Sequence, residues 1–192
     1  MTSISAVILA AGASRRLGQP KQLLRLNPTI SETLLERAVR LAREADLSPV
    51  IVILGANHEA IAAATSLGDA ITILNPDWPE GMASSIRLGL HTTLQLAPSA
   101  AGLLLMACDQ PAVTATHLRA LTATGTLTAS EYANRRGIPA YLPTSHWPSL
   151  ATLQGDTGAR NLLLRAATIP LPHGDLDIDT PEDLGQAQAL YR

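Results

Sequence analysis

The sequence is poor in aromatic residues, which make up 3% of its 192 residues and include no phenylalanine. Because 46% of the residues are hydrophobic, the core must be built from Leu, Ile, Val and Ala. Few aromatic side chains also argue against a stacking platform for single-stranded nucleic acid. With 16% charged residues, the composition is that of a globular protein and not of a disordered one.

A single cysteine, Cys108, excludes an internal disulfide framework and a zinc site built on cysteines. A reducing compartment suits such a chain, so we predict a soluble, cytoplasmic protein. The formal net charge is −2 and the basic residues are scattered, which predicts neither nucleic acid nor a membrane as a partner. The longest apolar run, about nine residues over 100–108, is too short to cross a bilayer, and the N-terminus lacks the basic region of a signal peptide.

Apolar runs alternate with segments of helical periodicity along most of the chain. The runs predict buried strands at 4–9, 50–54, 70–74 and 102–108. The periodic segments predict helices at 31–45, 57–64, 82–96 and 114–124. Such alternation is typical of a mostly parallel sheet with helices on both faces. Since the chain contains no repeat, low-complexity tract or linker, residues 1–192 are predicted to form a single domain.

The pattern loosens after residue 124. Short strands are predicted at 128–133 and 140–142, around a turn at Arg135-Arg136-Gly137, and the Pro and Gly content indicates a lid or an excursion from the main sheet. The later elements expected are helices at 147–153 and 159–166 and a weak strand at 169–171. Thr180 is predicted to cap a terminal helix, with Pro181 at its first position.

Three features follow predicted strands, at the end where ligands bind in a parallel α/β sheet. The loop Ala11–Arg16 follows the first strand, Gly81–Ser85 follows the third, and Asp109 follows the fourth. We expect these segments to share one site. Trp78 and Met82, near the second segment, are interpreted as packing residues.

The first loop has what a polyphosphate requires. Gly12 allows close backbone approach, successive N–H groups can form an anion-binding nest, and Arg16 and Lys21 add positive charge. Lys21 is the only lysine, beside thirteen arginines, which favours a compact charge on a phosphate; the alternative is an ordinary exposed lysine. The spacing matches neither a Walker loop nor the Gly-x-Gly-x-x-Gly dinucleotide motif.

Asp109 follows a very apolar strand, where a carboxylate serves either as the N-cap of the next helix or as a metal ligand. Magnesium binds one or two protein carboxylates together with substrate phosphates. Asp177 or Asp179 would supply the second carboxylate, although Asp179 also precedes the start of a helix. The residues alone leave capping and metal binding open. Cys108 is interpreted as a small buried hydrophobe.

Six segments in chain order resemble signature segments of the molybdenum cofactor cytidylyltransferase family, within the nucleotidyltransferase superfamily. The first reads Leu-Ala-Ala-Gly-Ala-Ser-Arg-Arg-Leu-Gly-Gln-Pro-Lys-Gln-Leu-Leu, and the set is 9–24, 75–85, 108–111, 137–140, 155–160 and 177–183. The resemblance implies a Rossmann-like three-layer α/β/α nucleotidyltransferase fold with a mostly parallel mixed sheet. It also implies a Mg²⁺-dependent enzyme that moves CMP from CTP to the phosphate of molybdopterin or the molybdenum cofactor and releases pyrophosphate.

The resemblance carries the nucleotide-binding roles of the family to matching positions. The residues implied to bound the base pocket are Leu9, Ala10 and Ala11. Ala11 favours CTP, because guanylyl members usually carry a glycine there that admits the larger purine. The residues implied to stabilise the phosphates are Gly12, Arg16 and Lys21.

Metal and acceptor roles follow from the same resemblance. Asp109 and Asp179 are implied to hold Mg²⁺, which neutralises charge at the reacting phosphoryl group. The implied catalytic residues are Arg16, Lys21 and Asp109. The residues implied to bind the acceptor are Ser84, Ser85 and Arg160, with Arg87 and Arg136 as further candidates.

Other functions stay open at this point. The alternative enzyme is a guanylyltransferase, or a cytidylyltransferase for another phosphate acceptor. The alternative of another class is a non-catalytic carrier or chaperone of the molybdenum cofactor. The expected partners are CTP or another NTP, a molybdopterin-type phosphate acceptor and, as a candidate, a molybdenum hydroxylase apoenzyme. Residues 25–31 depart from the family, which often has a Gly-rich turn there.

Overall fold

Seven strands form one sheet in the order β3-β2-β1-β4-β6-β5-β7. The computed structural model describes residues 3–191. The strands are β1 (Ile4–Ala10), β2 (Val50–Leu54), β3 (Ile71–Leu74), β4 (Gly102–Ala107), β5 (Thr128–Tyr132), β6 (Arg135–Pro143) and β7 (Ala167–Pro170). β6 runs antiparallel to both of its neighbours, and every other pairing is parallel. The prediction of a mostly parallel, mixed sheet is confirmed.

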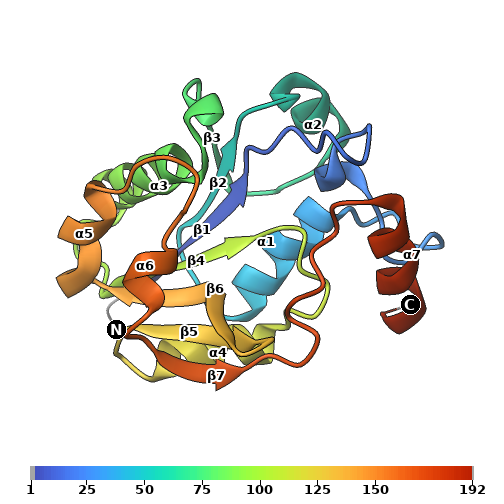
Figure 1. The fold of residues 1–192 in the computed structure, drawn as a ribbon. Helices are drawn as coiled ribbons and strands as arrows, with labels where there is room; N and C mark the ends of the chain where they lie inside the picture. Colours follow the sequence, from blue (N-terminus) through green and yellow to red (C-terminus); the bar gives the residue numbers. More distant parts are fainter. Residues whose placement is uncertain (1–2, 192) are drawn as a thin grey trace.

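Helices cover both faces of this sheet (Figure 1). They are α1 (Leu34–Glu44), α2 (His58–Ala64), α3 (Met82–Leu96), α4 (Ala115–Ala123), α5 (Trp147–Ala151), α6 (Arg160–Leu163) and α7 (Pro181–Leu190), with short 3₁₀ turns at η1 (Lys21–Leu23), η2 (Trp78–Glu80) and η3 (Thr144–His146). Among residues 3–191, no helix has both the length and the apolar character needed to cross a bilayer.

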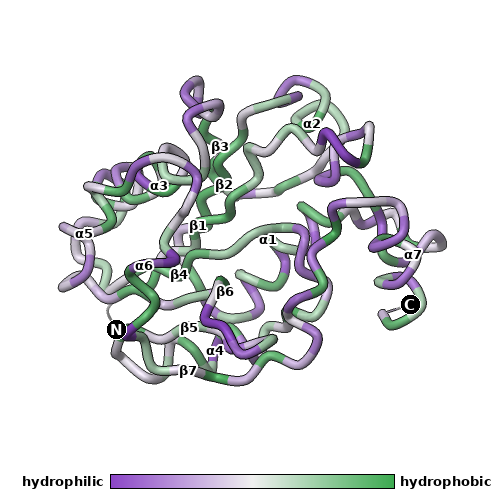
Figure 2. The backbone as a smooth tube through the Cα atoms, viewed as in Figure 1, coloured by the Kyte–Doolittle hydropathy of each residue, from purple (hydrophilic) through white to green (hydrophobic). Residues whose placement is uncertain are grey.

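Alternate side chains of the central strands pack into two separate hydrophobic cores, one on each face of the sheet. On β1, Ile8 packs with residues of α1, α2 and α4, whereas Val7 and Leu9 pack with residues of α3, α5 and α6. This alternation is the period of two expected of a strand that is buried on both faces. Figure 2 shows these strands as a continuous hydrophobic centre. The result is the predicted three-layer α/β/α arrangement.

The prediction of a lid or excursion after residue 124 is wrong. β5 and β6 belong to the main sheet, where β6 pairs with β4. The turn between them lies at Ala133 and Asn134, both with positive φ, and not at Arg135-Arg136-Gly137. Proline is rare inside a paired strand, and Pro139 lies within β6. The pairing shifts register between Ala129 and Ser130, however, so the unpaired Pro139 falls in an irregularity of the ladder.

Smaller differences concern the ends of elements. α1 begins at Leu34, and not near 31, because Thr33 and Glu36 form a reciprocal capping box. Asn57 occupies the N-cap position of α2, as predicted, but its side chain makes no capping bond. Thr180 caps α7 with Asp183 as its partner, which confirms that prediction. β6 is longer than predicted, and α5 and α6 are shorter.

The buried His117 makes the stability of the fold depend on pH. Its Nε2 lies 2.7 Å from Ser130 Oγ, and burial lowers the pKa of His117 below the ordinary value of 6.5. The unfolded chain therefore takes up a proton near pH 6.5 that the folded chain resists. We expect no loss of stability from this residue above pH 6.5, a growing loss below it, and no further loss below the folded pKa.

Urea unfolding of the wild type and of His117→Gln, between about pH 7.5 and about pH 5, measures this loss. Glutamine does not titrate, so the stability advantage of the wild type should shrink as the pH falls. An advantage that stays constant across that range would contradict a buried neutral His117.

Candidate active site

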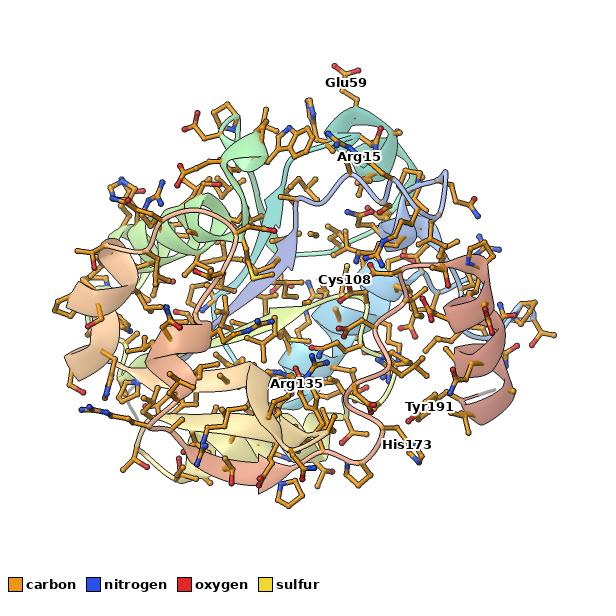
Figure 3. The ribbon with its side chains drawn as sticks, in the orientation of Figure 1. Arg15, Glu59, Cys108, Arg135, His173 and Tyr191 are labelled. Carbon is orange, nitrogen blue, oxygen red and sulfur yellow. The ribbon has the colours of Figure 1, made fainter. Side chains whose placement is uncertain are left out.

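The loop after β1 and the residues after β4 leave the sheet side by side. Leu9 on β1 pairs with Ala107 on β4, so Ala11 and Asp109 emerge at the same edge. The segment before α7 joins them, because Ile178 N donates a hydrogen bond to Asp109 O at 3.0 Å. Figure 3 shows Cys108 at this edge, between Arg15 on one side and Arg135 on the other. Of the three segments expected to share one site, the loop Ala11–Arg16 and Asp109 therefore lie at this edge, and the segment before α7 joins them.

Lys21 lies between two carboxylates at this edge. Its Nζ contacts Asp109 Oδ2 and lies 2.9 Å from Asp179 Oδ1. Arg16 Nη2 lies 2.5 Å from the other oxygen of Asp179. Burial alone would lower the pKa of Lys21, but Asp109 and then Asp179 outweigh it and raise that pKa. Lys21 therefore carries its charge at any physiological pH.

A third carboxylate, Asp177, stands beside this group. Burial, and then the charge of Asp109, raise the pKa of Asp177 to about 6. Residues 177–179 thus bring two carboxylates toward Asp109. The sequence left open which of them accompanies Asp109, and the structure brings Asp179 to the shared lysine.

A small apolar cluster holds the first loop against the C-terminal segment. Its buried members are Leu17, Leu24, Leu26, Leu34, Ile178 and Ala187. Gln188 of α7 adds a hydrogen bond from Nε2 to Arg25 O at 2.9 Å, and Figure 1 shows α7 beside this loop. The segment 25–31, which departs from the family pattern, therefore contributes to the support of α7. These contacts hold the backbone near Lys21 and the backbone near Asp179 together, so the two side chains keep their relative positions.

Gln22 fixes the backbone of the first loop. It is fully buried, and its Nε2 donates to Ala10 O at 2.7 Å and to Gly12 O at 3.2 Å. Ser14 Oγ accepts a hydrogen bond from Lys21 N at 3.0 Å. A side chain added at Gly12 would meet nothing within 4 Å, so the loop backbone there is open to a ligand.

A first cleft of about 470 Å³ opens beside this loop. Its lining residues come from the ends of β1 and β4, from the loop before α3 and from the start of α3. They are Leu9, Ala11, Gly12, Arg15, Lys21, Trp78, Pro79, Glu80, Gly81, Met82, Ser85, Ala107, Asp109 and Asp156.

A second cleft of about 220 Å³ lies on the other side of Asp109. It is lined by Met82, Ala107, Asp109, Gln110, Tyr132, Arg135, Arg136, Gly137, Ile138, Asp156, Thr157, Ala159, Arg160, Leu163 and Asp177. Asp109 and Met82 belong to both clefts, as do Ala107 and Asp156. Two molecules, one in each cleft, would meet at Asp109.

Most of the residues predicted for the site line one of the two clefts. Of the predicted residues, the first cleft is lined by Leu9, Ala11, Gly12, Lys21, Ser85 and Asp109. The second cleft is lined by Asp109, Arg136 and Arg160. Ala10 does not line either cleft: it is 2% exposed, and its carbonyl is bound by Gln22. Arg16 is exposed and directed at Asp179, while its neighbour Arg15 lines the first cleft.

The structure does not bring Ser84 or Arg87 to either of these two clefts. Ser84 Oγ accepts from Asn75 Nδ2 at 2.9 Å and donates to Gly81 O at 2.9 Å, so it supports the start of α3. Arg87 pairs with Glu80 and donates to Leu153 O. Both residues therefore stabilise the loops around the site, which is a different role from the acceptor contact predicted for them.

Sequence reasoning missed several lining residues. Trp78 and Met82 were interpreted as packing residues, yet both line the first cleft. The signal that could have found them is their place in the loop that joins β3 to α3, at the ligand-binding end of the sheet. Asp156 was missed because its loop reaches the site by packing closely against Gly81, where an added Cβ would lie 2.7 Å from Gly155 O.

The carboxylates fit a divalent cation. Asp109 and Asp179 already converge on one positive charge, the Nζ of Lys21. Among residues 3–191, no group of three or more His, Cys, Asp and Glu side chains gathers as a complete metal site. Two carboxylates, with the remaining ligands supplied by substrate phosphates, are the set that Mg²⁺ commonly uses.

Cys108 is predicted to be chemically inert in the folded protein. It is buried, and burial, followed by the charge of Asp109, raises the pKa of its thiol to about 12. Since the thiolate is the reactive form, we expect no labelling by a thiol reagent at about pH 8, and one label per chain after unfolding in urea. Labelling of the native protein as fast as the unfolded one would contradict this burial.

The family comparison finds one match along most of the chain. A model of the MobA-like NTP transferase domain matches residues 6–169. Nicotine blue oxidoreductase of Paenarthrobacter nicotinovorans is 31% identical over 204 residues, covering 98% of this chain and 95% of that protein. A probable molybdenum cofactor guanylyltransferase of Opitutus terrae is 30% identical over 117 residues, covering 59% of this chain and 52% of that protein.

A solved structure agrees with the sequence relatives. Rv0371c from Mycobacterium tuberculosis H37Rv superimposes with a TM-score of 0.84 at 32% identity, covering 98% of each chain. A second structure of that protein, a complex with manganese, has a TM-score of 0.78 at 30% identity, covering 98% of this chain and 99% of that one. The predicted Rossmann-like nucleotidyltransferase fold is confirmed.

Proposed function

Because the chain belongs to the family of MobA-like NTP transferase domains, we propose that it is a nucleotidyltransferase that transfers CMP from CTP to the terminal phosphate of a molybdopterin-type acceptor. An oxygen of the acceptor phosphate attacks the α-phosphorus of CTP. The bond from that phosphorus to the bridging oxygen of the β-phosphate breaks, and pyrophosphate leaves. In this proposal residues 1–192 act as one nucleotidyltransferase domain.

The observation that carries the proposal is the position of Asp109 in the wall that both clefts share. CTP occupies the first cleft, with its phosphates along the Gly12 backbone and near Lys21. The acceptor occupies the second cleft, with its phosphate toward Asp109 and Arg160. Catalysis then depends on positioning and on charge neutralisation, with no covalent protein intermediate.

Asp109 and Asp179 would hold a divalent cation, proposed to be Mg²⁺. When bound, the cation neutralises charge on the reacting phosphates. Lys21 moves from the carboxylates to the triphosphate, where its charge stabilises the leaving pyrophosphate. Arg16, which is exposed and paired with Asp179, orients that carboxylate and is close enough in sequence to Gly12 to assist at the phosphates. The manganese complex of Rv0371c supports a cation in a related chain.

Ala11 selects the smaller base in this proposal. The backbone that carries its methyl group is held in place, because Ala56 N donates a hydrogen bond to Ala11 O at 3.1 Å. We expect Ala11→Gly to lower the preference for CTP, measured as kcat/KM for CTP divided by kcat/KM for GTP, by about tenfold. One carbon in a binding pocket commonly changes discrimination between substrates by about this much. Ala13→Gly removes a methyl from the same loop outside the cleft and is the matched control. An unchanged ratio in Ala11→Gly would remove Ala11 as the selector.

Pyrophosphate release tests the reaction. The protein is incubated with Mg²⁺, with CTP, GTP or ATP, and with molybdopterin, methylerythritol phosphate or a sugar phosphate. We expect release with CTP and molybdopterin alone. Release only with GTP would make the chain a guanylyltransferase, and release only with an acceptor other than a pterin would overturn the proposed acceptor.

An oxidoreductase is the second candidate, because the relative from Paenarthrobacter nicotinovorans bears that name and covers nearly the whole chain. Oxidation of NADH or NADPH with a quinonoid dye as electron acceptor tests it directly. Turnover of the nicotinamide that survives Asp109→Asn, together with no pyrophosphate release under any condition above, would favour this candidate over nucleotidyl transfer.

A further inference from the structure

The lining of the second cleft includes three arginines, Arg135, Arg136 and Arg160. Within residues 3–191, none of the three forms an ion pair with a carboxylate. Arg135 and Arg136 begin β6 and Arg160 begins α6, so two separate elements present these charges. Unpaired arginines in a concave site are suited to an anionic ligand, because the guanidinium group binds oxyanions with two parallel hydrogen bonds.

Arg135 is held in place by an aromatic ring. Its guanidinium carbon lies 5.4 Å from the centre of the Tyr132 ring, a cation–π distance. The ring lies there because residue 137 is a glycine: an added Cβ would be 2.0 Å from Tyr132 Oη. Figure 3 shows Arg135 directed toward the middle of the molecule, on the same edge as Cys108.

Arg136, which follows Arg135 on β6, is held by the backbone of the segment after α6. Its Nε donates to Ala166 O at 3.1 Å, which leaves the two terminal nitrogens to bind another group. Both side chains are thus oriented before any ligand binds. Preorganised side chains lose less entropy on binding, so an oxyanion gains more from them than from free surface arginines.

The carboxylates of the second cleft are Asp109, Asp156 and Asp177. Asp109 marks the place where the acceptor phosphate reacts in the proposed function. Arg160 is assigned to that phosphate, and Arg135 and Arg136 belong to a different element. One reacting phosphate therefore does not account for all three arginines.

We infer that Arg135 and Arg136 bind a second anionic group of the acceptor, an oxyanion separate from the phosphate that reacts near Asp109. The inference rests on the proposed function, in which the second cleft holds the acceptor. Arg135 and Arg136 are then specificity-determining residues: acceptors with an oxyanion at the far end bind well, and neutral acceptors of the same length bind poorly.

Two phosphates of matched shape test this selectivity by calorimetry in the presence of Mn²⁺. Para-carboxybenzyl phosphate carries the second oxyanion, and para-methylbenzyl phosphate replaces it by a methyl group. We expect the wild type to bind the carboxylated compound tenfold to a hundredfold more tightly, the usual range for hydrogen bonds to charged groups. Arg135→Gln/Arg136→Gln should bind the two compounds equally, and Arg165→Gln, an exposed arginine outside the cleft, should keep the preference.

Tyr132 variants test the orientation of Arg135. Tyr132→Phe and Tyr132→Leu both lose the hydroxyl bond to Ile138 O, but only the leucine loses the ring. We expect Tyr132→Phe to keep the preference for the carboxylated compound and Tyr132→Leu to lose part of it.

The outcomes separate this inference from the proposed function. A preference that disappears in the double variant, without transfer from any nucleotide, would keep the arginine site and overturn the proposed reaction. A wild type that binds both compounds equally, or neither of them, would overturn the arginine site even if transfer to molybdopterin is observed. A double variant that retains the full preference would overturn it as well.

Discussion

Asp109→Asn is expected to slow nucleotidyl transfer by on the order of 10²–10³-fold, the usual effect of removing one group that stabilises transition-state charge. The carboxylate lies where the two clefts meet, and asparagine replaces its charged oxygens by one neutral oxygen, which binds a divalent cation more weakly. The measurement is the initial rate of pyrophosphate release at saturating CTP, Mg²⁺ and acceptor. The melting temperature of the variant, measured in parallel, shows whether the fold has survived.

Asp69→Asn is the matched control for Asp109→Asn. Asp69 is a 91% exposed side chain paired with Arg43, far from either cleft, and its loss should leave the rate unchanged. A folded Asp109→Asn protein with full activity would remove Asp109 from the chemistry. If Asp109→Asn left every measurable activity unchanged while the pterin still bound, a non-catalytic carrier of the molybdenum cofactor would explain the protein better than an enzyme.

Lys21→Met is expected to lower the rate of transfer by about 10²-fold, since it removes the only lysine of the chain, which is proposed to stabilise the leaving pyrophosphate. The same variant should bind Mn²⁺ about tenfold more tightly in the absence of nucleotide, because Lys21 now competes with the cation for Asp109 and Asp179. Calorimetric titration with Mn²⁺ measures the affinity, and pyrophosphate release measures the rate.

Lys21→Arg separates charge from shape in that experiment. Arginine retains the positive charge beside the carboxylates, so the affinity for Mn²⁺ should not rise. A Lys21→Met protein that binds Mn²⁺ more weakly than the wild type would mean that the lysine does not occupy the cation position. A Lys21→Met protein with the full rate of transfer would remove Lys21 from the reaction.

The fold was predictable because its central strands are short apolar runs separated by strongly periodic helices. The boundaries of α3 match the prediction residue for residue, since Met82–Leu96 follows a rigid loop and has uninterrupted helical spacing. β6 was predicted too short because Gly137 and Pro139 resemble loop residues. The glycine instead makes room for Tyr132, and the proline falls in an irregularity of the strand pairing.

The site was predictable where it depends on strand ends and less so where it depends on packing. Gly12 and Asp109 were predicted because they follow strands, and Lys21 because it is the only lysine; all three line the first cleft. Ser84 resembled a substrate contact, but whether a serine at the start of a helix faces a cleft or Asn75 depends on how the helix is rotated. Asp156 enters the site through the close approach of two glycine-containing loops, which no local pattern in the sequence indicates.

The fate of the α-phosphate tests the central claim most directly. The protein is incubated with Mg²⁺, molybdopterin and CTP labelled at the α-phosphate, and the products are separated. Transfer of CMP predicts that the label moves into a molybdopterin cytosine dinucleotide, with one unlabelled pyrophosphate released for each label transferred. Label that stays in CTP, or that appears as free CMP or CDP with no labelled pterin, would contradict it.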